Sequence, residues 1–282
     1  MRSKKFKLQG YEQDIVDKYN SGQNLKEIAR FYNVEYRVVK RILIEQNIEI
    51  RDALISAAMV NRKYYDFFND INSEDKAYFL GLLSADGTIY QAKVKSQKQI
   101  KLSIVESDGY IIEKFKEVGR ASQKVVHSDN MATISFCSDG MAEDLAKLGV
   151  TPFKTSRKNI PDISNEFMRH YIRGLFDGDG CVYKSSKYVI SINFISQSEE
   201  FLNNLMNYLR HNNIDTQNIR HIKRDNLYSF NIAKKESVVK FYNLIYAGSN
   251  IFLIRKFKKF NKLLKEIYEI DIAVGVWYDL HI

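Results

Sequence analysis

Apolar and polar positions along the chain follow a helical period first and a strand period later. Apolar residues recur at helical spacing over 11–19, until the Asn20-Ser21-Gly22 break. Two more short helices are predicted over 25–32 and 35–46. Asn33, which tolerates the left-handed conformation, makes the turn between them. Residues 1–50 are therefore predicted to form a unit of three helices.

The last two of these helices have the spacing of a helix-turn-helix. Small Ala29 lies four residues before Asn33 and lets two helices cross closely. The third helix then turns polar and aromatic side chains to solvent, where they could reach a major groove and its phosphates. The DNA-contact residues predicted here are Tyr36, Arg37, Lys40 and Arg41. The alternative is a plain three-helix bundle with a solvated basic face.

Residues 51–72 show no strong period and are interpreted as a connector. From residue 73 the chain repeats itself. YFLGLLSADG at 78–87 matches YIRGLFDGDG at 171–180, and the segment at 123–136 matches that at 217–230 with an offset of 94. Each copy reads helix, two strands, helix, two strands, helix. We predict two repeats, over 73–160 and 161–282.

Alternation within the predicted strands separates an apolar face from a polar one. In 99–105 the apolar side chains point one way and Gln99, Lys101 and Ser103 point the other. The predicted fold class is α+β: two pseudo-twofold αββαββα repeats form antiparallel, DNA-binding sheets behind a small all-α helix-turn-helix domain. The polar sheet faces form a saddle for nucleic acid, or else are ordinary solvated faces.

The composition of the chain indicates which chemical class of partner it binds. Lys and Arg number 43 against 34 Asp and Glu among 282 residues, a net charge of +9. Such an excess favours a polyanion, with nucleic acid ahead of an anionic membrane. Two cysteines cannot build a disulfide framework or a four-ligand zinc site. With no signal peptide or bilayer-spanning apolar run visible, we expect an intracellular, cytoplasmic protein. A bacterial or phage gene is the expected source.

The two matching ten-residue blocks, 78–87 and 171–180, contain the candidate catalytic residues. Each predicted helix has a small-x-x-x-small notch, Gly81 with Ala85 and Gly174 with Gly178, and glycine within a helix costs about 1 kcal/mol. We expect Gly81 and Gly174 at the contact between the two helices. Each helix ends in Asp-Gly, and the glycine suits a left-handed cap. Asp86 and Asp179 would then meet at one end, where like charges repel and a divalent cation stabilises both.

These blocks resemble the LAGLIDADG homing endonucleases in their single-chain, two-motif form. Residues 79–87 (FLGLLSADG) and 172–180 (IRGLFDGDG) match the nine-letter motif in the glycines and the final Asp-Gly. The resemblance extends from about residue 73 to the C-terminal helix. It implies a monomer whose paired motif helices form the domain interface and whose sheets straddle the major groove of a long, pseudo-palindromic double-stranded DNA target.

The resemblance also implies residue roles. Asp86 and Asp179, with the backbone carbonyls of Ala85 and Gly178, would bind Mg²⁺ (or Mn²⁺) and cut two phosphodiesters across the minor groove, leaving short 3′ overhangs. A basic residue near the catalytic water is expected at Lys154 in the first repeat. In the second it is Lys256, with Arg255 its close competitor. The alternative for all of these basic residues, Lys154 included, is a phosphate contact or plain surface. The sixth motif position departs from symmetry, because it holds Ser84 in one motif and Asp177 in the other.

Further DNA contacts are nominated on the predicted strands, and Arg255 is nominated because the segment 255–265 is basic and holds either a backbone contact or a solvated helix face. Arg and Lys are suited to phosphates or guanine, and Gln and Asn to adenine. The nominated residues are Gln91, Lys93, Lys95, Gln99, Lys101, Ser103, Lys184, Ser191, Asn193, Arg220, Arg224, Ser229 and Arg255. His127 and His221 are expected to be structural or DNA-facing rather than metal ligands. The sequence therefore predicts a site-specific, metal-dependent DNA endonuclease of the intron-homing kind. The alternatives are a non-cleaving DNA-binding regulator and an intron RNA maturase on the same scaffold.

Overall fold

The computed structural model describes residues 8–20, 23–50, 66–91, 98–119, 121, 123–152 and 158–270. The chain divides into two compact units, Met1–Asp66 and Phe67–Ile282. The connector predicted over 51–72 lies largely outside the described residues. Among the described residues, no helix has the length and apolar character that crossing a bilayer requires.

The first unit holds three helices, α1 (Glu12–Asn20), α2 (Leu25–Phe31) and α3 (Tyr36–Glu45). Asn24 and Glu27 form a reciprocal capping box that fixes the start of α2. Asn33 adopts a φ of 52°, so the predicted left-handed turn between α2 and α3 is confirmed. Apolar side chains from all three helices form a core of their own, and α3 presents its basic side chains to solvent.

The second unit contains two antiparallel four-stranded sheets. The first follows the order β1-β2-β4-β3 and the second the order β5-β6-β8-β7. The elements of the first repeat are α5 (Glu74–Asp86), β1 (Gly87–Gln91), β2 (Lys98–Val105), η2 (Glu106–Asp108), α6 (Tyr110–Val118), β3 (Val126–Ser128), β4 (Met131–Cys137) and α7 (Asp139–Lys147). Those of the second are α8 (Asn165–Asp179), β5 (Cys181–Ser186), β6 (Val189–Ser196), α9 (Glu199–His211), β7 (Arg220–Ile222), β8 (Leu227–Ile232), α10 (Lys235–Tyr246) and α11 (Ile254–Tyr268). The predicted α+β fold of two repeats is confirmed.

One element exceeds the predicted repeat, because α11 follows α10 in the second copy. Phe260, Leu264 and Tyr268 form an apolar stripe on this helix, and α11 packs against β5 and β6. Tyr268 also accepts a hydrogen bond from the Ile190 N–H at 3.2 Å. The stripe explains why a helix with so many lysines docks on a sheet. Four of them, Lys258, Lys259, Lys262 and Lys265, stay exposed, whereas Lys256 is half-buried.

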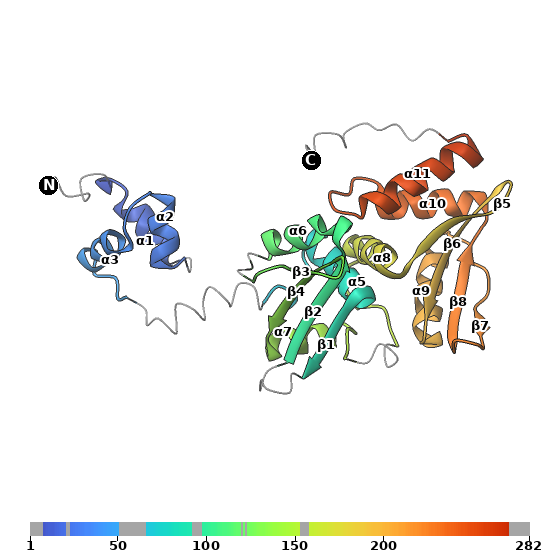
Figure 1. Cartoon of the computed structure of the whole chain (residues 1–282), viewed down its shortest axis with the longest axis horizontal. Helices are drawn as coiled ribbons and strands as arrows, with labels where there is room; N and C mark the ends of the chain where they lie inside the picture. The colour runs from blue at the N-terminus through green and yellow to red at the C-terminus, as the bar shows by residue number, and fades with distance from the viewer. Residues whose placement is uncertain are drawn as a thin grey trace. The chain divides into compact units, whose positions relative to one another are not determined.

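Each sheet buries one face beneath helices. In β2 the side chains of Ile100, Leu102 and Ile104 are buried while those between them are half-buried. Helices α6 and α7 pack against the first sheet, and α9, α10 and α11 pack against the second (Figure 1). The alternation read from the sequence therefore orients both sheets, leaving a polar face on each.

Helices α5 and α8 lie side by side and parallel between the two sheets (Figure 1). A Cβ built on Gly81 would lie 2.0 Å from the carbonyl oxygen of Tyr171, and one on Gly174 would lie 2.0 Å from that of Tyr78. The structure thus places both predicted interface glycines at the helix contact, where only a hydrogen fits.

Candidate active site at the ends of the motif helices

Asp86 and Asp179 end α5 and α8 at the same end of the helix pair. Asp86 is half-buried and Asp179 is exposed. A Cβ placed on Gly178 would lie 2.2 Å from the Ala85 Cβ and 3.1 Å from Oδ2 of Asp86. The Asp86 carboxylate therefore sits against the residue that precedes Asp179, and the notch at Gly178 permits this approach.

The glycine after each acid corrects a sequence-based expectation. Gly87 has φ −71° and Gly180 has φ −74°, so neither is left-handed. Both are extended, and each N–H donates back to the helix, to Leu83 O and Phe176 O respectively. A Cβ at Gly87 would lie 2.3 Å from the Leu83 oxygen. Glycine is required because the chain turns tightly into a strand, not because of its φ.

Lys256, in the first turn of α11, reaches the end of α8. Its Nζ donates to the carbonyl oxygens of Phe176 at 2.7 Å, Gly178 at 3.2 Å and Gly180 at 2.5 Å. An ammonium group suits this position because a helix C-terminus carries partial negative charge. Burial lowers the pKa of Lys256, while the charges of Asp177 and of Asp86 oppose that shift. Lys256 and Arg255 were the two candidates for the basic group of the second repeat. Lys256 contacts the carbonyls on both sides of Asp179, whereas Arg255 pairs with Asp108 at 2.5 Å.

Asp177, at the sixth motif position, is fully buried. Its Oδ2 accepts hydrogen bonds from the Tyr78 hydroxyl at 2.9 Å and from the Leu253 N–H at 2.7 Å. Burial raises the pKa of Asp177 to about 6, and the hydrogen bond from Leu253 opposes the shift. Ser84, also buried, holds the equivalent position in the first motif. The two motif ends are therefore built differently.

The donor set fits a hard divalent cation. No group of three or more His, Cys, Asp or Glu side chains that could hold a metal occurs among the described residues. Two carboxylates beside helix-end carbonyls are instead the kind of partial oxygen site that Mg²⁺ uses, with water and substrate phosphate completing its coordination. The Gly178 carbonyl already accepts a hydrogen bond from Lys256, so its remaining lone pair would be the one offered to a metal.

The DNA-contact candidates of the first sheet lie on its polar face. Lys101 is half-buried opposite Ser135, and the Ser103 hydroxyl shares a hydrogen bond of 2.8 Å with that of Thr133. Gln99 Oε1 accepts a hydrogen bond from the Tyr90 hydroxyl at 2.8 Å. Gln91 pairs with Lys98 through the backbone, and its side chain lies outside the described residues. Lys93, Lys95 and Lys154 lie outside them as well.

Two candidates of the second sheet need correction. Ser191 is only 3% exposed, because it lies opposite Tyr183 and its hydroxyl donates to that of Ser185. Lys184 is exposed but pairs with the core residue Ile190, so it belongs to the helix-covered face. The bulge between Lys184 and Ser186 ends the regular alternation there.

The remaining candidates of the second sheet lie on or beside its polar face. Asn193 is half-buried and donates to Asn231 Oδ1 at 2.7 Å. Arg220 is exposed and pairs with the half-buried Ser229. Arg224 lies in the turn before β8, where it forms an ion pair with Asp225 at 3.2 Å. In the first unit, Tyr36, Arg37, Lys40 and Arg41 are all exposed on α3.

Sequence reasoning missed a pair of tyrosines on the polar faces. Tyr90 is 40% exposed opposite Gln99, and Tyr183 is 36% exposed opposite Ser191. Each follows its motif acid by four residues. The signal was present in the sequence, since the motif offset of 93 residues relates the two positions. Both histidines expected to be structural or DNA-facing are exposed; His127 pairs with Glu106 at 2.9 Å, and His221 stacks on Tyr228.

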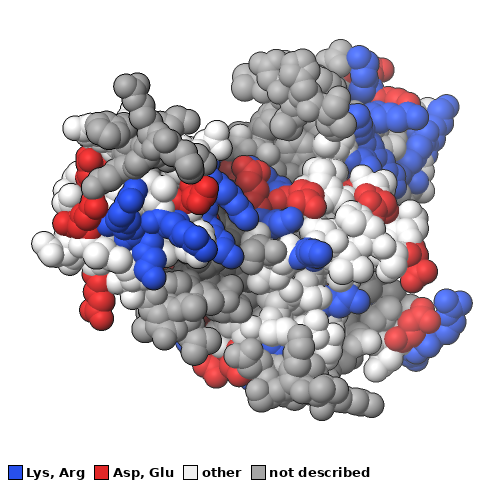
Figure 2. Space-filling view, turned by 60° about the vertical axis from the view of Figure 1, so that its left-hand side comes forward, with Lys and Arg blue, Asp and Glu red and all other residues white. Residues whose placement is uncertain are grey.

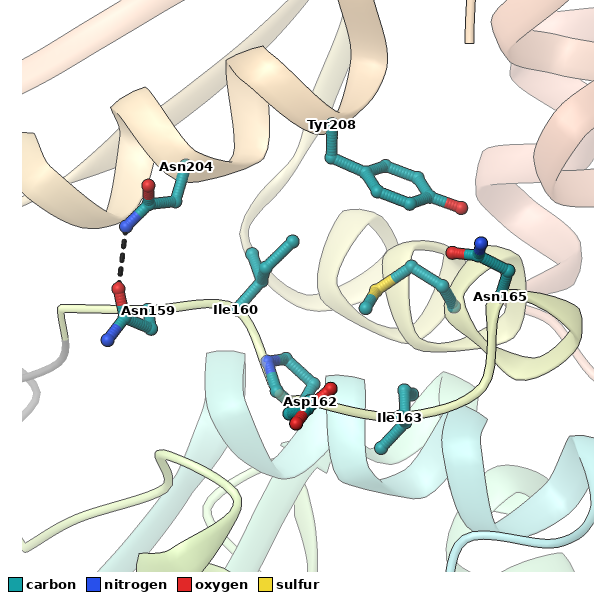
Figure 3. A pocket seen from close by; sticks show the side chains of 9 residues that line it. Asn159, Ile160, Asp162, Ile163, Asn165, Asn204 and Tyr208 are labelled. Carbon is teal, nitrogen blue, oxygen red and sulfur yellow. Dashed lines mark hydrogen bonds between the residues drawn. The ribbon is translucent and has the colours of Figure 1, made fainter. Parts of the chain in front are cut away.

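A cavity of about 510 Å³ lies at the opposite end of α8 from Asp179 (Figure 3). Asn204 on α9 and Asn159 in the preceding segment meet at its edge through a hydrogen bond of 2.7 Å. The cavity is lined by Asn159, Ile160, Pro161, Asp162, Ile163, Asn165, Met168, Asn204 and Tyr208. Its place at the start of α8 separates it from the acids that end the motif helices.

Comparison with known proteins supports the fold assigned above. Residues 166–246, from the first turn of α8 to the end of α10, match the family described as LAGLIDADG-like domain. A search of curated proteins found none that matches this chain.

Solved structures with similar folds are LAGLIDADG enzymes. A point mutant of I-SmaMI is 11% identical with a TM-score of 0.50, covering 68% of this chain and 92% of that one. I-AabMI, a LAGLIDADG meganuclease bound to uncleaved DNA, is 13% identical (TM-score 0.49; 68% and 91% covered). I-DmoI in complex with DNA and Ca is 15% identical (TM-score 0.49; 69% and 97%). At these identities the likeness to I-SmaMI shows the LAGLIDADG homing-endonuclease fold alone.

Proposed function

We propose that this protein is a metal-dependent endonuclease that cuts both strands of a specific DNA duplex. The observation that carries the proposal is the meeting of two motif ends: the Asp86 carboxylate lies against Gly178, and Lys256 binds the carbonyl of the same residue. Carboxylates of two repeats near one half-buried ammonium would form a compact centre for phosphodiester hydrolysis. The LAGLIDADG match over 166–246 supports the same chemistry.

The roles follow from position. Asp86 and Asp179 would hold Mg²⁺ or Mn²⁺, which when bound supplies an activated water and neutralises the phosphate. Lys256 offers positive charge where a pentavalent phosphorane would develop its negative charge. The polar faces, with Gln99, Lys101, Asn193 and Arg220, would lie along the grooves. Cutting across the minor groove would leave short 3′ overhangs, and the chain would act as a monomer with both acids in one polypeptide.

The first unit would extend the contact beyond the cut site. Its α3 places Tyr36, Arg37, Lys40 and Arg41 on an exposed face after the Asn33 turn, as a helix-turn-helix requires. Figure 2 shows Lys and Arg side chains gathering in groups on the face it views. Such groups supply affinity that does not depend on base sequence.

The test uses DNA that flanks the gene, joined without the gene, as a supercoiled substrate with Mg²⁺. We expect linear product with mapped 3′ overhangs, and none when Ca²⁺ or a chelator replaces Mg²⁺. Asp86→Asn and Asp179→Asn should abolish double-strand cutting while binding by gel shift persists. Asp215→Asn, which removes an exposed acid paired with Lys234, is the matched control. Unimpaired cutting by either motif variant would contradict the metal assignment.

A further inference from the structure

Helix α11 begins without a cap of its own. Leu253 occupies the N-cap position and makes no side-chain hydrogen bond to the helix. The first N–H groups of a helix have no partner within it, so they must find acceptors elsewhere. Lys256 lies in this first turn, and whatever fixes the turn also fixes the lysine.

Two side chains from other elements supply the missing acceptors. Asp177 Oδ2, from α8, accepts the Leu253 N–H at 2.7 Å. The hydroxyl of Tyr110, from α6 of the first repeat, accepts the Ile254 N–H at 2.7 Å and donates to Phe252 O at 3.0 Å. A single hydroxyl thus holds the backbone on both sides of Leu253. The Asp177 carboxylate is suited to this end because a helix N-terminus carries partial positive charge.

The first repeat supplies further restraints. Asp108, 3% exposed in η2, pairs with Arg255 at 2.5 Å. Tyr78 of α5 holds Asp177 itself through a hydrogen bond of 2.9 Å. Side chains of the first repeat therefore restrain the turn that carries the basic group of the second. Ser84 stands where the first motif would need a carboxylate to build the same cap.

We propose that Tyr110 is a positioning residue, which caps α11 across the repeat boundary and so keeps Lys256 against the end of α8 beside Asp179. This inference rests on the proposed nuclease function. It makes the second cutting centre dependent on the first repeat. Because the Lys256 ammonium spans three carbonyl oxygens, a small rotation of the first turn would displace it, and a displacement of about 1 Å can cost a hundredfold in rate.

The test is Tyr110→Phe in the full chain, which removes only the hydroxyl and keeps the ring. A duplex that the wild-type chain cuts, labelled differently on each strand, gives the two cutting rates at saturating protein, and a gel shift gives the affinity. We expect one strand to be cut about tenfold more slowly, so that nicked DNA accumulates. The other strand and the affinity should stay within about twofold of wild type. Tyr208→Phe, on α9 at the far cavity, is the matched control and should change neither rate.

A double variant separates positioning from general damage. If Tyr110 acts through Lys256, then Tyr110→Phe combined with Lys256→Met should cut no more slowly than Lys256→Met alone, and both changes should slow the same strand. Equal slowing of both strands, or fully additive losses, would overturn the inference and leave the nuclease function standing. A wild-type chain that binds its duplex but never cuts it would instead remove the proposed function, and this inference with it.

Discussion

Gly174 lies so close to Tyr78 that a Cβ on the glycine would be 2.0 Å from the tyrosine carbonyl oxygen, and Gly81 stands in the same relation to Tyr171. The obstacle is backbone in both cases, so no side-chain rotation can relieve it. The two contacts are reciprocal, as expected for a pseudo-twofold axis running between α5 and α8. They set the separation of the helices and therefore that of the acids at their ends.

Replacing the interface glycine tests this contact directly. Gly174→Ala should lower the free energy of unfolding by about 3 kcal/mol, because the added methyl must push two helices apart in a packed interior. Urea denaturation measures the change. Gly140→Ala is the control, since a Cβ there meets only the Ser138 hydroxyl oxygen at 3.9 Å and should be neutral or slightly stabilising. Equal behaviour of the two variants would show that α5 and α8 do not pack this closely.

Removing the half-buried ammonium of Lys256 should slow cutting more than it weakens binding. We expect Lys256→Met to lower the cleavage rate of one strand by about a hundredfold, which corresponds to about 2.7 kcal/mol of transition-state stabilisation. Affinity for the duplex should change little because Lys256 is engaged with three backbone carbonyls. Single-turnover cleavage at saturating protein gives the rate. Lys259→Met, an exposed lysine one turn along α11, should cut normally; an equal loss there would assign the effect to general charge.

His170, buried beside Arg173, should make one acid-sensitive contribution to the stability of the fold. Burial, followed by the charge of Arg173, lowers the pKa of His170 to about 4. Between pH 6.5 and 4 the unfolded chain therefore binds a proton that the folded chain does not, and stability falls as pH falls. At pH 5 this penalty amounts to about 2 kcal/mol.

The measurement compares wild type with His170→Gln at pH 7 and pH 5. Asp177 acts in the opposite direction, because a raised carboxyl pKa favours the folded state as pH falls. Both proteins contain Asp177, so its contribution cancels when their free energies of unfolding are subtracted. We expect the wild type to lose about 2 kcal/mol relative to the variant on going to pH 5. If the stability difference between wild type and His170→Gln is the same at pH 7 and pH 5, the pKa of His170 is not lowered in the folded state.

The periodicity of the sequence predicted much of the fold. Alternation at 99–105 oriented the first sheet correctly, and the small residues of the motifs located the helix contact, because both signals are local and repeat within the chain. The burial of Arg173 was not predicted from the sequence. Its guanidinium donates to Glu74, Ser249 and the carbonyls of Ile245 and Ile251, partners that the sequence scatters over 178 positions. Nothing local marks a basic residue within a motif as fully buried.

The polar faces show where alternation fails. Ser191 has the right parity but is buried opposite Tyr183. Lys184 has the other parity, because it shares a face with Val182 and pairs with Ile190 before the bulge. Parity fixes which side of a sheet a residue takes, whereas burial depends on how large the paired side chain is. Tyr90 and Tyr183 were not nominated, although each alternates with a buried neighbour, Ile89 and Val182, and so takes the polar face.

Three basic side chains of α3 predict how the first unit takes part in binding. Replacing Arg37, Lys40 and Arg41 together by Gln in the full chain should weaken binding and shorten the protected footprint on one side of the cut site only. If each contacts a phosphate, the slope of log K against log salt should fall by about 3. The cut itself should still form at saturating protein, because α3 is not part of the acid centre. Lys26→Gln on α2 controls for charge in the same unit. A full-length footprint with an unchanged salt slope would take DNA contact away from α3.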